Sequence, residues 1–191
     1  MINKEINISE YISFVDENIE LLSQENATKL IIKLEELQKD YLNQLEDKYY
    51  TTENQTILFE AFEPEFDLKK LKSENMENAE VKALLKETEE LGYKVETAEG
   101  SFFPIIDYGF YEKYSVYVTE DMKDYINIMA VESDKTPAKD AALVISWDEL
   151  FERAFNQEKF LNEHNESVKL EEIKALYKKY VTFAIYGLDN T

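Results

Sequence analysis

The amino-acid sequence predicts an all-α fold, an irregular multi-helix bundle, from three observations. Apolar residues recur three and four positions apart over most of the chain, which is the period of an amphipathic helix. Residues that favour helix caps precede several of these runs. Only four glycines and three prolines occur in 191 residues, so few turns are forced. The hydrophobic content of 44% predicts a packed core despite a net charge of −20.

The N-terminal part predicts an antiparallel helical hairpin. The first helix is expected at residues 9–22 with Asn7 as its cap, and the second from an Asn26 cap to Tyr50. The connection is three or four residues long, which predicts that the two helices lie side by side. Acidic residues such as Glu35 fall between the apolar positions of the second helix and are expected to face solvent.

The remaining helices follow from similar signals. We expect one helical domain over residues 1–191, subdivided into an N-terminal hairpin region at 1–62 and a C-terminal subdomain at 78–191, because the stretch 63–78 is polar and broken. The expected helices are 57–62, 78–91 with an Asn78 cap, 107–116, one after Thr119, one after the Ser146–Glu149 capping box, and the last from Ser167 to Gly187.

The segment between residues 93 and 108 is the least regular. Residues 93–97 alternate apolar and polar, but no partner strand is evident, so an extended connection is expected there. A buried apolar loop is expected near 99–108, where it fills the core; a binding surface is the alternative. The apolar side chains of this loop are Phe102, Phe103, Ile105 and Ile106.

Aromatic residues crowd the next positions and define a candidate ligand groove. An aromatic core explains them, and so does a groove that stacks sugars or peptide side chains. The candidate groove residues are Glu99, Phe102, Phe103, Asp107, Tyr108, Tyr111 and Trp147.

The sequence contains no motif for catalysis. The absence of cysteine excludes disulfides, thiolate catalysis and cysteine-ligated metals, and four isolated glycines form no phosphate-binding loop. The one histidine, His164, lies near a helix end, where an exposed capping role is expected. We therefore predict no catalytic residue, no cofactor and no metal site. The carboxylates that follow Trp147, at Asp148, Glu149 and Glu152, leave a hydrolase as a third function.

The second half of the chain carries a family resemblance. Its motifs are Gly92-Tyr93, Ala98 to Tyr108, Tyr125-Ile126, Ala130 to Ser133, Ile145-Ser146-Trp147, and Tyr186 to Thr191. Over residues 92–191 the chain resembles uncharacterised helical domains of exported proteins, often lipoproteins, of Gram-positive bacteria. The resemblance implies an extracytoplasmic location and a lipid anchor upstream of this chain. It implies no activity.

These observations predict a non-catalytic, extracytoplasmic helical module that binds a protein, a peptide or a cell-wall polymer at the bacterial surface. The net charge of −20 repels nucleic acid, which is therefore not an expected partner, and the longest apolar runs are too short for a transmembrane segment. The alternative is a cytosolic acidic inhibitor that mimics nucleic-acid charge. An export signal upstream of Met1 would favour the first function, and a native start at Met1 the second.

Overall fold

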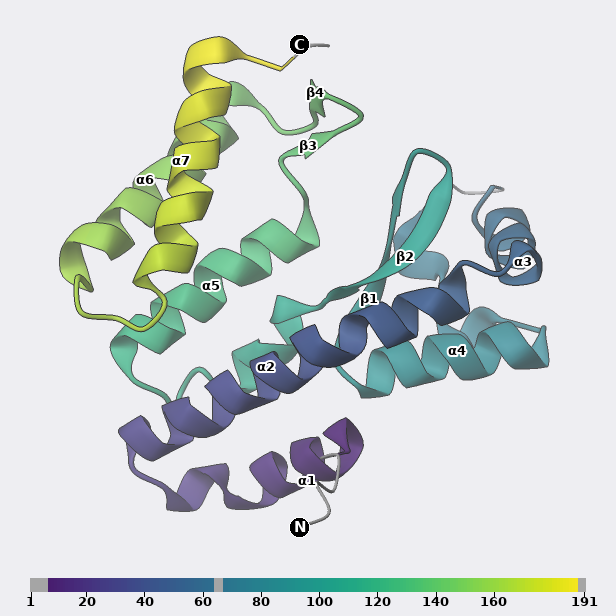
Figure 1. Cartoon of the computed structure of the whole chain (residues 1–191), viewed down its shortest axis with the longest axis horizontal. Coiled ribbons are helices and arrows are strands. Elements are labelled where there is room, and N and C mark those ends of the chain that lie inside the picture. Colours follow the sequence, from purple (N-terminus) through teal and green to yellow (C-terminus); the bar gives the residue numbers. More distant parts are fainter. Residues whose placement is uncertain (1–6, 64–66, 189–191) are drawn as a thin grey trace. The chain divides into compact units, whose positions relative to one another are not determined.

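The computed structural model describes residues 7–63 and 67–188, and most of these residues are helical, which confirms the predicted fold class (Figure 1). None of the described helices is long and apolar enough to cross a membrane. The α-helices are α1 (Ile8–Asn18), α2 (Gln24–Tyr49), α3 (Thr52–Phe62), α4 (Ala79–Glu90), α5 (Glu120–Asp134), α6 (Trp147–Glu163) and α7 (Leu170–Tyr186). The 3₁₀ helices are η1 (Ile19–Leu21), η2 (Leu68–Lys70), η3 (Ser73–Asn75) and η4 (Tyr108–Tyr114). The strands are β1 (Tyr93–Ala98), β2 (Ser101–Ile106), β3 (Ala138–Lys139) and β4 (Ala142–Leu143).

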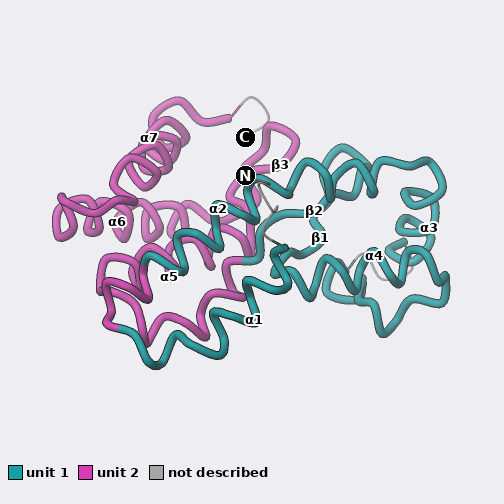
Figure 2. Tube along the Cα trace, turned by 60° about the horizontal axis from the view of Figure 1, so that its bottom comes forward, with its two compact units in different colours: residues 1–22, 29–107 teal, residues 23–28, 108–191 magenta. Residues whose placement is uncertain are grey.

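Backbone packing divides the chain into two compact units (Figure 2). Unit 1 contains residues 1–22 and 29–107, and unit 2 contains residues 23–28 and 108–191. The expected single domain, with its subdivision at 62 and 78, stays a prediction. Part of the expected hinge, residues 64–66, lies outside the described residues, as does the end of the last family motif at residues 189–191.

The N-terminal helices form the expected hairpin, most of which belongs to unit 1. The Asn7 side chain caps α1 by accepting hydrogen bonds from the amides of Ser9 and Glu10, at 2.9 and 3.3 Å. The predicted Asn26 cap is wrong. Helix α2 begins at Gln24, two residues before Asn26. The Ser23 hydroxyl accepts a hydrogen bond from the Asn26 amide at 3.4 Å. Both residues favour caps, so composition alone does not choose between them.

Helix α2 buries polar side chains as well as apolar ones. Glu35 is buried, which corrects the expectation that it faces solvent, and its carboxylate lies 2.9 Å from the Lys39 ammonium. Gln38 is also buried and donates to the Leu91 carbonyl at 2.6 Å, near the end of α4. The Tyr93 hydroxyl donates in turn to the Gln38 carbonyl at 2.7 Å. The hydrogen bond from Gln38 satisfies a carbonyl that the end of α4 leaves open.

Residues 93–106 form an antiparallel β-hairpin, so the expected extended connection and buried loop are both corrected. Strand β1 pairs with β2 from Tyr93 opposite Ile106 to Ala98 opposite Ser101. Glu99 and Gly100 make the turn, both with positive φ, as a two-residue hairpin turn requires. Alternation along β2 buries Phe102 and Ile106 and leaves Phe103 and Ile105 half-buried.

Unit 2 is a helical assembly of α5, α6 and α7 with an aromatic core. The Ser146 hydroxyl accepts the Glu149 amide at 3.1 Å, which confirms the predicted cap of α6. Helices α6 and α7 lie side by side around Ile145, Leu150 and Tyr180 (Figure 1). The expected helix at 107–116 is the 3₁₀ helix η4, whose tyrosines are buried against α5.

The hairpin register makes a prediction about Phe102. Its ring is 1% exposed and lies edge-on to Phe62, with ring centroids 5.4 Å apart. We expect Phe102→Ala to lower the free energy of unfolding by about 3–5 kcal/mol, as for other fully buried rings. The matched variant Phe103→Ala removes a half-buried ring on the other face and should cost about 1–2 kcal/mol. Urea denaturation of both variants measures this difference, and equal losses would contradict the register.

Candidate functional site

Helix α6 exposes three of its four aromatic side chains and buries two polar ones. Trp147, Phe151 and Phe155 are 44%, 55% and 64% exposed. They recur every fourth residue and therefore form one stripe, which we call the aromatic ridge. The opposite stripe contains Arg153, which is 6% exposed, and Gln157, which is fully buried. Leu150 and Phe160 are buried as in a usual amphipathic helix, but the exposed rings and the buried Arg153 and Gln157 invert that pattern over the rest of α6.

A buried ionic network accounts for the inversion. Arg153, the one arginine of the chain, donates from Nη1 to the Lys135 carbonyl at 2.8 Å and from Nη2 to Glu149 Oε1 at 2.5 Å. Its Nη1 also lies 3.6 Å from Glu132 Oε1. Because a desolvated charge needs counter-charges, these contacts fix the orientation of α6 against α5 and α7.

Glu132 is the acceptor at the centre of this network. Its Oε1 accepts from the Tyr180 hydroxyl at 2.5 Å and from Gln157 Nε2 at 3.5 Å. Burial raises the pKa of the Glu132 carboxyl, although Tyr180 and Arg153 act in the opposite direction. Burial also raises the pKa of the Tyr180 hydroxyl, which keeps it a donor.

Acidic side chains frame the aromatic ridge. Asp148, Glu152 and Glu158 are exposed and lie three or four residues from the ridge residues, which places them beside the ridge on α6. Lys159 is exposed too and lies four residues after Phe155, whereas the one arginine of α6 is buried. The ridge is therefore an apolar stripe whose border carries three carboxylates and one ammonium, with a net negative charge.

Among the carboxylates after Trp147, Glu149 lacks the electrostatics of a general acid. Glu149 is held by Arg153 and by Lys135, whose ammonium lies 3.2 Å from Glu149 Oε2. The hydrogen bond from Arg153 lowers the pKa of the Glu149 carboxyl. A general acid of a glycosidase requires a raised pKa, so the shift runs the wrong way for that role.

The predicted groove residues fall in both units. In unit 1, Glu99 lies in the hairpin turn, Phe102 in the core and Phe103 on the half-buried face, and Asp107 pairs with Lys94 at 3.1 Å. In unit 2, Tyr108 and Tyr111 are buried and stacked, with ring centroids 5.7 Å apart, whereas Trp147 is exposed. Of the seven, Trp147 is the large aromatic side chain that is open to solvent. The groove that combines them stays a prediction.

His164 ends α6 as expected, but its ring is not the exposed cap that was predicted. The side chain is 17% exposed, its Nε2 lies 2.8 Å from Asp124 Oδ2, and its ring lies edge-on to Phe160. Asp124, Glu163 and His164 place their potential ligand atoms within 4.8 Å of one another, so these residues could hold a metal ion. The separation of Asp124 from His164 in the sequence conceals this cluster.

The exposure of Phe151 and Phe155 was not predicted from the sequence. Their spacing from Trp147 was visible, but an apolar stripe on a helix is ordinarily its buried face.

Comparison with family models, with curated proteins and with solved structures gives no match for this chain.

The raised pKa of Glu132 predicts a pH dependence. Its ordinary value is 4.5, and the folded state holds the proton more tightly than the unfolded chain. The stability that Glu132 contributes is therefore lost as the pH rises from about 4.5 through the folded pKa. We expect the free energy of unfolding of the native protein, minus that of Glu132→Gln, to fall as the pH rises above about 4.5. Urea denaturation over this range measures it, and a difference that rises with pH would show that the ion pair with Arg153 outweighs burial.

Proposed function

We propose that this chain is a non-catalytic binding module whose aromatic ridge on α6 docks a basic, amphipathic segment of a protein or peptide. The observation that carries the proposal is the inversion of α6, because three large rings are held in water while an arginine and a glutamine are buried. Exposed aromatic clusters with a polar border are typical of protein interaction sites.

The border of the ridge selects the partner by charge. Asp148, Glu152 and Glu158 are exposed beside the rings, and the chain carries a net charge of −20. A partner with apolar side chains for the rings and lysine or arginine for the border meets both features. An acidic segment would be repelled, and a neutral polymer would leave the border without a counter-charge.

The proposal includes a location outside the cytoplasm, at the surface of a Gram-positive bacterium, because the resemblance over residues 92–191 implies it. The residues encoded upstream of Met1 test that part. A signal sequence with a lipid-attachment motif supports the location, and a native start at Met1 supports a cytosolic protein.

The single tryptophan makes the docking directly measurable, since Trp147 belongs to the ridge. We expect a helical peptide of leucine and lysine to shift Trp147 fluorescence to shorter wavelengths, with saturation. The same peptide with glutamate in place of lysine should not. Phe155→Ser leaves the tryptophan in place and should weaken binding about tenfold or more, as for an interface hot spot.

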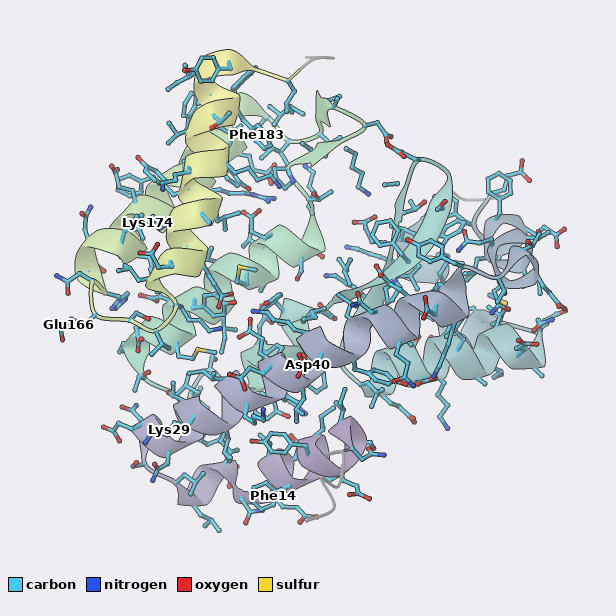
Figure 3. All side chains as sticks on the ribbon, viewed as in Figure 1. Phe14, Lys29, Asp40, Glu166, Lys174 and Phe183 are labelled. Atoms are coloured by element: carbon cyan, nitrogen blue, oxygen red, sulfur yellow. The ribbon has the colours of Figure 1, made fainter. Side chains whose placement is uncertain are left out.

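A matched control is available in unit 1. Phe14 on α1, labelled in Figure 3, is 50% exposed, so Phe14→Ser makes the same change on an exposed ring of the other unit and should leave binding unchanged. Binding that is insensitive to Phe155→Ser and disappears at about 0.5 M salt would instead support the charge-mimicking inhibitor. A saturable shift with peptidoglycan fragments, but not with the peptide, would make a cell-wall polymer the partner.

A further inference from the structure

The C-terminal end of α6 and the first half of α5 bring together three potential metal ligands, Asp124, Glu163 and His164. One ligand atom from each of them lies within 4.8 Å of the ligand atoms of the other two. Asp124 belongs to α5, Glu163 is the last residue of α6, and His164 caps that helix, so all three belong to unit 2. The cluster lies at the opposite end of α6 from Trp147 and is separate from the aromatic ridge.

The spacing of the ligand atoms already suits an ion. His164 Nε2 lies 2.8 Å from Asp124 Oδ2. An imidazole nitrogen and a carboxylate oxygen that both bind one zinc ion at about 2.0–2.2 Å are about 3 Å apart, so an ion can replace the hydrogen bond with little movement. The Phe160 ring packs edge-on against the His164 ring, with centroids 5.0 Å apart, which restricts the imidazole before any ion binds.

The cluster is accessible to an ion from solvent. The side chains of Asp124 and Glu163 are 41% and 52% exposed. His164 and Glu163 also line a depression of about 410 Å³ at this end of α6. Three protein ligands leave at least one coordination position for water, and the depression provides room for it.

The charge around the cluster favours a cation. The C-terminal end of α6 contributes the negative pole of the helix dipole. The Lys159 ammonium lies 3.8 Å from Glu163 Oε2, but both side chains are more than half exposed, so this ion pair offsets little of the negative charge. The described residues that line the depression include no lysine or arginine and four carboxylates, which are Glu120, Asp121, Glu163 and Glu166.

The histidine selects the kind of ion. Calcium and magnesium prefer sites made of oxygen ligands, whereas an imidazole nitrogen suits zinc and other divalent transition metals. The chain has no cysteine, so the site offers no thiolate, and its nitrogen and carboxylate donors match zinc bound outside a sulfur site.

We infer that Asp124, Glu163 and His164 bind one divalent transition-metal ion, represented here by zinc, through two carboxylate groups and His164 Nε2. The bound ion joins the end of α6 to α5. The inference does not depend on the docking function of the ridge.

The single histidine provides a direct test, because its ring signals are the only histidine signals in the NMR spectrum of the chain. We expect zinc to shift these signals with saturation at one ion per chain. In titration calorimetry at about 0.15 M salt, which screens diffuse attraction to the acidic surface, zinc should bind at least about tenfold more tightly than calcium or magnesium. Zinc that leaves the ring signals unchanged, or calcium that binds as tightly as zinc, would overturn the inference.

A matched pair of variants assigns the binding to this cluster. Asp124→Asn removes one charged ligand and should weaken zinc binding about tenfold or more, because even the loss of an outer-shell partner commonly costs that much. Asp148→Asn removes the same charge at an exposed position near the other end of α6 and should bind zinc as the native protein does. Circular dichroism checks that both variants are folded.

Two outcomes would refute the assignment. Native zinc affinity in Asp124→Asn would show that this carboxylate is not a ligand, and equal weakening in both variants would show that zinc responds only to the net charge. Phe155→Ser should keep the native zinc affinity, so a failure of peptide docking and a failure of metal binding are distinguishable.

Discussion

The organisation of unit 2 depends on the burial of one guanidinium group. Arg153 joins three elements, since it donates to the carbonyl at the end of α5, pairs with Glu149 on α6 and reaches the Tyr180 hydroxyl on α7 at 3.4 Å. A buried charge that lost these partners would carry most of its desolvation penalty. Because successive helical residues point about 100° apart, fixing the direction of Arg153 also fixes the direction of every other side chain on α6.

The exposed aromatic ridge is the consequence of that constraint. Burying an aromatic or large aliphatic side chain contributes about 1.5–3 kcal/mol, so three half-exposed rings forgo a contribution that is large beside the marginal stability of a domain. A rotation of α6 that turned the rings inward would pull Arg153 away from Glu132. The helix keeps the charge network and leaves the rings in water. Local rules are most often broken in this way where a surface has a function.

The sequence predicted features that depend on neighbouring residues and missed those that depend on distant ones. The Asn7, Asn78 and Ser146 caps act over two or three residues and were predictable. Strand β1 was missed because its partner contains Pro104 and looked like a loop, and pairing is a property of both segments. The polar residues on the buried faces of α2 and α6 were missed for a similar reason. The spacing of apolar residues does not indicate that a glutamate, glutamine or arginine is buried when its partner comes from another helix.

The same dependence on distant partners connects the ridge with the rest of unit 2. Arg153 reaches the end of α5 and the Tyr180 hydroxyl on α7 through its terminal nitrogen Nη1, and these contacts set the direction in which the rings point. A partner that docks on the ridge in this orientation must, by linkage, stabilise the buried contacts that hold it. The size of that coupling is limited by how far α6 can turn, and the paired contacts of Arg153 with Lys135 and Glu149 leave it little freedom. The ridge should therefore meet its partner as a nearly rigid surface.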